Sequence, residues 1–149
     1  MDIFRLSLHL KNRDILYSLV ALAKDRDQGE FCLRLAKFFA HEKEDELAVT
    51  FFNQALEKGV YDSDSLLVIG KIALEKNLFP EARELFSLAL KNFPQDANIY
   101  LVYTQTLLKE AFLTLAEGLK KNPDDTTLTN TLKDVQETFT HLAKLKLHL

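Results

Sequence analysis

The side chains best suited to catalysis or metal binding are four histidines and one cysteine, and their positions show no pattern that such chemistry requires. These residues are His9, Cys32, His41, His141 and His148. A zinc site needs ligands at short, characteristic spacings, and no histidine here forms a His-x-x-x-His pair or adjoins a second cysteine or histidine. Cys32 lacks the local signature of a nucleophile and is better interpreted as a small packed hydrophobe. The sequence therefore predicts no catalytic residue, no metal site and no cofactor, and an enzyme remains an unsupported alternative.

Acidic clusters and glycines also fit structural roles. Glu42, Glu44, Asp45 and Glu46 look like a solvated turn, and the pair Asp124-Asp125 looks like a helix cap. Four glycines in the whole chain are too few for a phosphate-binding loop. We therefore expect this chain to act through a binding surface and not through a reactive side chain.

The composition indicates an all-α protein. The chain has 149 residues, of which 47% are hydrophobic, with only four Gly and three Pro to form turns. A net charge of −3 with scattered Lys and Arg argues against nucleic acid as a partner. The longest uncharged apolar stretches, 15–23 and 97–108, are far shorter than a bilayer span, so no membrane insertion is expected. One cysteine favours a reducing compartment, and we expect a soluble, cytoplasmic protein.

A period of 34 residues organises the chain. Leu33, Leu67 and Leu101 are spaced by it. The same interval relates the pairs Ala48 and Ala82, Phe52 and Phe86, and Ala55 and Ala89. A period of this length is typical of repeat architectures, in which each unit is one helical hairpin and neighbouring units bury a shared core.

This pattern resembles the tetratricopeptide repeat (TPR) family. In the second repeat its signature positions read Leu66, Gly70, Ala82, Phe86, Ala89 and Pro94. The first repeat matches through Ala36, Ala48, Phe52 and Ala55, with Val60 in place of the closing proline. The resemblance covers roughly residues 29–125 and implies an α-solenoid of about three TPR-like helical hairpins in one domain.

The resemblance divides the chain into five segments. They are an N-terminal arm and capping helix (1–28), repeat one (29–62), repeat two (63–96), a shortened repeat three (97–125) and a C-terminal capping helix (126–149). Turns are expected near 41–45, 60–63, 77–79, 93–96 and 122–125. Leu6, Leu8 and Leu10 alternate, so the first ten residues fit an extended arm as well as a short helix.

The third repeat departs from the period. Pro94 and Pro123 are 29 residues apart, so five residues are missing where the turn between the two helices should lie. The segment 107–112 contains no Gly, Pro or Asn that would end a helix. Either the hairpin is very tight or its two helices fuse into one. We favour the shortened hairpin because Ala111 and Leu115 still fit the second helix of a repeat.

The resemblance also implies a binding surface. In this family one stripe of each first helix lines a concave groove. In this chain that stripe reads Leu33, Lys37 and Ala40, then Leu67, Lys71 and Leu74, then Leu101, Gln105 and Leu108. We expect Leu67 and Leu101 to be partly exposed, and Lys37 and Lys71 to orient acidic groups of a ligand. The alternative is that the chain's own ends fill the groove, through Leu6, Leu8 and Leu10 or through Leu142, Leu145, Leu147 and Leu149.

These expectations favour a protein-binding module or a small chaperone. Its partner would be an apolar peptide or an amphipathic helix of another protein, laid in the groove. In size and architecture the chain is similar to the small TPR chaperones of bacterial type III secretion. The rival is a structural adaptor that assembles a larger complex through its ends or convex face, and a homodimer remains open. The sequence names no partner.

Overall fold

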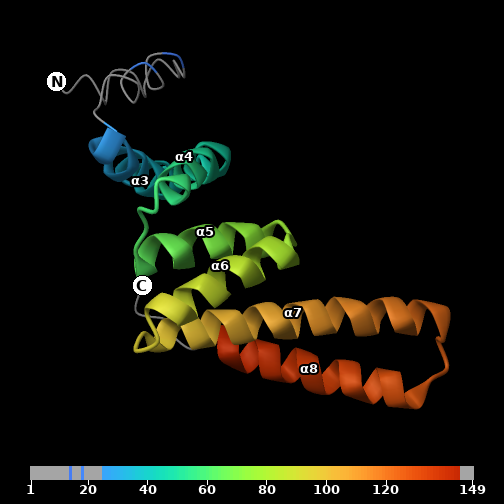
Figure 1. Cartoon of the computed structure of the whole chain (residues 1–149). Helices are drawn as coiled ribbons and strands as arrows, with labels where there is room; N and C mark the ends of the chain where they lie inside the picture. Colours follow the sequence, from blue (N-terminus) through green and yellow to red (C-terminus); the bar gives the residue numbers. More distant parts are fainter. Residues whose placement is uncertain (1–13, 15–17, 19–24, 145–149) are drawn as a thin grey trace. The chain divides into compact units, whose positions relative to one another are not determined.

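The described part of the chain consists of helices joined by short turns. The computed structural model describes residues 14, 18 and 25–144, and contains no strand in that part of the chain. Six helices are α3 (Asp25–His41), α4 (Asp45–Glu57), α5 (Ser63–Glu75), α6 (Phe79–Asn92), α7 (Ala97–Lys121) and α8 (Thr126–Lys144) (Figure 1). The all-α prediction is confirmed. The expected N-terminal arm and most of its capping helix lie outside the described residues.

The chain forms two compact units. The first is Met1–Ser65, and the second is Leu66–Leu149. The boundary falls in the first turn of α5, so the first unit holds α3 and α4, and the second holds the rest of α5 with α6, α7 and α8.

The helix boundaries follow the 34-residue period. The ends of α3 and α5, at His41 and Glu75, are 34 residues apart. The same interval relates the starts of α4 and α6 (Asp45 and Phe79) and the starts of α5 and α7 (Ser63 and Ala97). The turns repeat too: Lys43 and Asn77 both have positive φ, of 60° and 59°. Each turn is closed by a backbone hydrogen bond of 2.9 Å, from Glu44 N–H to the Phe39 carbonyl and from Leu78 N–H to the Ala73 carbonyl. The period is therefore a structural repeat of helix, turn and helix.

The core of the first unit is aromatic. The rings of Phe39 on α3 and Phe51 on α4 stack with centroids 5.5 Å apart. Leu35 on α3 and Phe52 on α4 are also fully buried. Ala48 and Ala55 take the contact positions of α4 and are fully buried, and their small side chains let α4 approach α3 closely.

In the second unit, α6 packs on α5 through a glycine. A Cβ added to Gly70 would lie 2.5 Å from Cε1 of Phe86, so only glycine leaves room for that ring. Phe86, Ala82 and Ala89 are completely buried on α6. The same Ala-Phe-Ala set that fills the first repeat therefore fills the second.

The third repeat has no turn, and the preferred shortened hairpin is wrong. α7 runs without interruption for 25 residues, whereas α5 has 13 and α6 has 14. Every residue from Leu107 to Phe112 sustains a helix, and with five residues deleted no segment remains to form a turn. The two expected helices are fused into one, which was the alternative considered.

The extra length of α7 pairs with α8. Their contacts run in opposite directions along the two helices, because Gln105 contacts Leu142 while Gly118 lies nearest Leu128. The Lys109 ammonium reaches the carbonyl of Leu74 at the end of α5, so the second half of α7 projects past the α5–α6 hairpin (Figure 1). After Thr106, no side chain that the structure describes is fully buried. Among the described residues, the projecting hairpin therefore has no closed core of its own.

Candidate protein-binding surface

The stripe on α3 is half-buried, and its lysine is already paired. Lys37 Nζ lies 2.6 Å from an Asp62 oxygen and 3.2 Å from an Asp64 oxygen. Leu33 and Ala40 are half-buried on either side of it. Two carboxylates of the same unit compensate the Lys37 charge, so the expectation that Lys37 receives an acidic group of a ligand is not supported.

Asp62 also caps α5. Its carboxylate accepts a hydrogen bond of 2.8 Å from Ser65 N–H, and the Ser65 hydroxyl accepts one of 3.1 Å from Asp62 N–H. Burial opposes ionisation of Asp62, but the hydrogen bonds from Lys37 and Ser65 outweigh it, so the pKa of the carboxyl is lowered. Burial likewise opposes the charge of Lys37, and its bonds to Asp62 and Asp64 outweigh this and raise its pKa. The cluster joins α3 to the start of α5.

The stripe on α5 is not an open surface. Leu67 is 1% exposed and Leu74 is 9% exposed, so the expected exposure of Leu67 is wrong. The reason is that α5 is buried on almost every side, because Leu66, Ile69 and Ala73 are buried as well. Lys71 is half-buried.

The stripe on α7 faces the C-terminal helix. The Gln105 side-chain amide donates a hydrogen bond of 3.2 Å to the Leu142 carbonyl of α8. Leu101 and Leu108 share this face of α7 and are half-buried. The alternative that the C-terminal segment fills this part of the predicted groove is therefore supported at Leu142. Leu145, Leu147, Leu149 and the N-terminal Leu6, Leu8 and Leu10 lie outside the described residues.

Apolar surface is open in a cleft between α7 and α8. The cleft has a volume of about 320 Å³. Its lining residues are Lys109, Phe112 and Leu113 from α7, and Gln136, Phe139 and Thr140 from α8. Leu113 is 41% exposed. Because an exposed leucine beside two half-buried aromatic rings gains from being covered, this cleft is the best candidate for contact with another chain.

Lys109 supplies the charge at the cleft. Its ammonium donates a hydrogen bond of 2.9 Å to the Leu74 carbonyl, an interaction that suits a cation near the end of a helix. Among the described residues no carboxylate forms an ion pair with it, whereas the neighbouring Glu110 accepts two bonds from Arg83, of 2.9 and 2.7 Å. The cleft therefore combines apolar floor residues with a cation that a negative group could approach.

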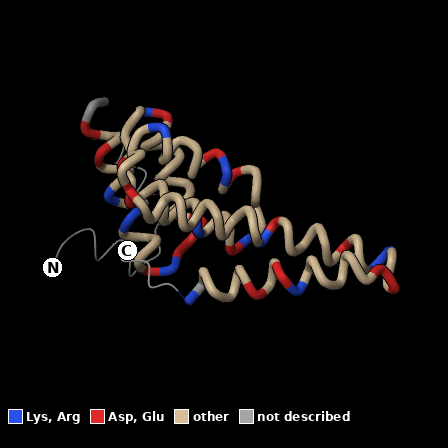
Figure 2. The backbone as a smooth tube through the Cα atoms, turned by 90° about the horizontal axis from the view of Figure 1, so that it is seen from below, with Lys and Arg blue, Asp and Glu red and all other residues tan. Residues whose placement is uncertain are grey.

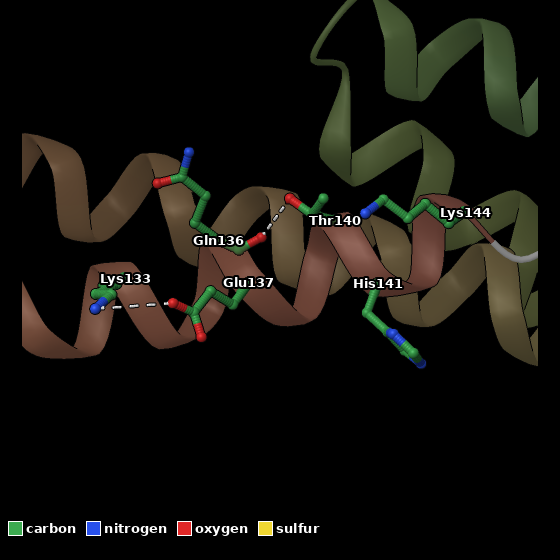
Figure 3. Close-up of a pocket in the computed structure, with 6 residues that line it drawn as sticks. All are labelled: Lys133, Gln136, Glu137, Thr140, His141 and Lys144. Atoms are coloured by element: carbon green, nitrogen blue, oxygen red, sulfur yellow. Dashed lines mark hydrogen bonds and ion pairs between the residues drawn. The ribbon is translucent and has the colours of Figure 1, made fainter.

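The outer side of α8 is polar. Figure 3 shows a shallow hollow lined by Lys133, Gln136, Glu137, Thr140, His141 and Lys144, all from this one helix. Lys133 and Glu137 lie 3.9 Å apart and are well exposed, so their ion pair contributes little. Residues of both charges lie along α8 and along the second half of α7 (Figure 2). We interpret this side as the solvated face of the helix.

The cleft was missed in the sequence because the fused helix was not the preferred interpretation. If Leu107–Phe112 is taken as continuous helix, Lys109, Phe112 and Leu113 fall beyond the point where α5 ends. The amphipathic pattern of α8, with Val135 and Phe139, then marks its partner. These signals could have located the hairpin, but not its open side.

The described part of the chain also contains potential metal ligands and one cysteine. No group of His, Cys, Asp and Glu there could hold a metal ion. Cys32 is buried, and its thiol lies 3.5 Å from the Gln54 side-chain oxygen. Burial raises the pKa of the Cys32 thiol, which nearby Lys58 only partly offsets. Within the same residues, no helix has the length and apolar character needed to cross a membrane.

Comparison with known proteins adds no relative. No protein-family model matches the chain, and no curated protein or solved structure matches it either.

Proposed function

We propose that the protein is a protein-interaction module that holds an apolar peptide or an amphipathic helix of another protein in the cleft between α7 and α8. The observation that carries the proposal is the open apolar lining of this cleft, in which Leu113 is 41% exposed beside Phe112 and Phe139. Covering one leucine contributes about 1.5–3 kcal/mol, so a ligand that buries Leu113 and part of the aromatic floor would bind measurably. Lys109 favours a ligand with an acidic residue among its apolar ones.

The fold we propose for this module is a TPR-like α-solenoid. Helix boundaries, turn residues with positive φ and buried Ala-Phe-Ala sets all recur at 34 residues, as expected of that architecture. α7 then combines the helices of a third, shortened repeat, and α8 serves as the terminal helix that covers the end of a repeat stack.

A cytoplasmic chaperone is the role that we favour for the module. A chaperone needs one accessible apolar surface that releases its client, and the α7–α8 cleft fits this need because Leu113 in its lining is 41% exposed. A type III secretion chaperone is one form of this proposal, resting on size and architecture alone. A structural adaptor is the alternative, and it would form stoichiometric assemblies and not hold one small partner. Co-purification from the native host, with identification of the bound chain, separates the two roles.

The direct test uses a defined probe. A fluorescently labelled amphipathic helical peptide, with leucines at i, i+3, i+4 and i+7 and one glutamate, is titrated against the full chain and followed by anisotropy. Leu113→Asp should weaken binding by about 10- to 150-fold, which corresponds to losing the burial of one leucine.

Leu107→Asp is the matched control. Leu107 is on the same helix and is 46% exposed, but it is six residues from Leu113 and therefore points about 120° away. Its substitution should change the affinity less than twofold, and both variants should keep the wild-type circular-dichroism spectrum. If the peptide binds Leu113→Asp as tightly as wild type, or if both variants lose it equally, the cleft is not the binding surface.

A further inference from the structure

We propose that, when no client occupies the cleft, a second copy of this chain closes it. The two α7 helices would pack antiparallel, with the Leu113 side chains of the two copies meeting at the two-fold axis. This inference rests on the proposed function, since it assigns a second occupant to the same cleft.

The first argument is the order of residues along the open side of α7. Lys109, Leu113 and Glu117 are spaced by four, and such rows form the ridges by which helices pack. A two-fold axis at Leu113 places each residue 113 − k opposite residue 113 + k of the other copy. Lys109 of each copy then faces Glu117 of its partner, so one leucine pair is flanked by two reciprocal ion pairs. An interface between identical surfaces must have this self-complementary order.

The second argument is that the charges are available. Lys109 forms no ion pair within the described residues and donates only to the Leu74 carbonyl. Glu117 lies 3.6 Å from Lys120 and 3.7 Å from Lys121, and all three side chains are more than half exposed. Exposed ion pairs within one helix contribute little to stability. Glu117 can therefore exchange these partners for Lys109 of a second copy at little cost.

The third argument is the missing layer. The α7–α8 hairpin has no fully buried side chain after Thr106 among those described, whereas each repeat hairpin has several. Two helices alone cannot enclose a core, because each covers only one side of the other. A second α7–α8 hairpin would supply the missing layer and complete a four-helix arrangement of the kind that stabilises helical bundles.

The experiment measures the mass of the full chain across a concentration series by light scattering and sedimentation equilibrium. Wild type should shift reversibly from one chain to two as concentration rises. Leu113→Asp should weaken the dimer by about two to four orders of magnitude, because both copies lose a buried leucine. Glu117→Lys should weaken it about tenfold or more, since two attractive pairs become repulsive. Leu107→Asp should leave the dimer unchanged.

Charge reversal tests the register. Lys109→Glu combined with Glu117→Lys restores both pairs in the antiparallel arrangement, so the double variant should dimerise more strongly than Glu117→Lys alone. A thermal melt of each variant checks that it is folded, since Lys109 also contacts α5. The amphipathic peptide should convert the wild-type dimer into a complex of one chain with one peptide.

A wild-type chain that stays monomeric up to about 1 mM, the range of the weakest specific pairs, would overturn the proposal. A dimer that survives Leu113→Asp would overturn it too, because the interface would then lie elsewhere. These outcomes are distinct from failure of the proposed function. A monomer whose Leu113→Asp variant still loses the peptide refutes only the dimer. A dimer disrupted by Leu113→Asp, beside unchanged peptide binding, refutes only the client site.

Discussion

The two repeat hairpins and the longer α7–α8 hairpin solve packing in opposite ways. In α3–α4 and α5–α6, short helices carry alanine at the contact positions and an aromatic ring between them, and Ala48, Phe52, Ala82 and Phe86 are all completely buried. In α7–α8, longer helices meet through half-buried side chains such as Phe112, Leu128 and Phe139. The comparison shows that helix length and amphipathicity alone do not close a core.

The physical difference lies in how closely the helices approach. At Gly70 there is no space for even a Cβ atom, because the Phe86 ring lies against the backbone. At Gly118 a Cβ would sit 3.6 Å from Leu128, which is ordinary van der Waals contact. Close contact between α5 and α6 excludes water and holds the two helices rigidly together. The looser contact between α7 and α8 leaves apolar side chains accessible to another chain.

The largest expected effect comes from deleting a ring in the closed core. Phe86→Ala should lower the free energy of unfolding by about 3–5 kcal/mol, through lost transfer energy and the cavity left behind. Phe112→Ala should cost less than half as much, since its ring is only half-buried. Urea unfolding followed by circular dichroism measures both, and equal losses would remove the distinction between the two regions.

The continuity of α7 gives the next largest effect. Ala111→Pro should cost about 3 kcal/mol, because proline removes a helical hydrogen bond and clashes with the preceding turn. In the shortened hairpin Ala111 would instead lie in the first turn of the second helix, where proline is accepted with little loss. A melting temperature close to wild type would restore the hairpin interpretation.

The two glycines provide a matched pair with smaller effects of opposite sign. Gly70→Ala should destabilise by about 1–3 kcal/mol, because the added methyl group overpacks against Phe86. Gly118→Ala should stabilise by up to about 1 kcal/mol, since alanine is the better helix former and the site has room. Chemical denaturation of the two variants compares them directly. Stabilisation by both would mean that the α5–α6 contact is looser than the structure shows.

The smallest effect concerns acid. The pKa of Asp62 is lowered below its ordinary value of 3.8 by Lys37 and Ser65, despite opposing burial. Its ionised form thus stabilises the fold at pH values above the unfolded pKa, and this contribution is lost as the pH falls through the lowered pKa. Asp62→Asn should flatten the fall in melting temperature below about pH 4. The effect is small because the side chains of Lys37 and Asp62 are both partly exposed. If the melting temperature of Asp62→Asn falls at low pH as steeply as that of wild type, the Lys37–Asp62 pair is not the cause of the acid sensitivity.

The sequence predicted the helices and turns of residues 29–96 well because their signals are local and periodic. The turns at Lys43 and Asn77 and the burial of Phe52 and Phe86 follow from a 34-residue interval that is visible without a structure. The exposure of single residues was harder to predict. Leu67 belongs to a stripe that was expected to be open, yet α5 is buried on several sides at once, and a helical face alone does not reveal this.

The candidate site could not be predicted from the sequence, because it depends on contacts between residues that are far apart in the chain. Lys37 lies 25 positions from Asp62, and only folding brings its ammonium to that cap. Lys109 reaches Leu74 across 35 positions, which fixes where α5 ends along α7 and leaves Leu113 uncovered. The five missing residues could be counted in the sequence. Which side chains they leave exposed could not be predicted, because that depends on how α8 packs against α7.

The central claim is that the open α7–α8 hairpin, and not the closed repeats, receives another chain. Hydrogen–deuterium exchange of the full chain, with and without the amphipathic peptide, tests it most directly. We predict that the peptide slows amide exchange in residues 109–121 and 128–140 and leaves residues 48–55 and 82–89 unchanged. Slower exchange in α5, without change in α7 and α8, would place the binding surface on the predicted groove and contradict the account.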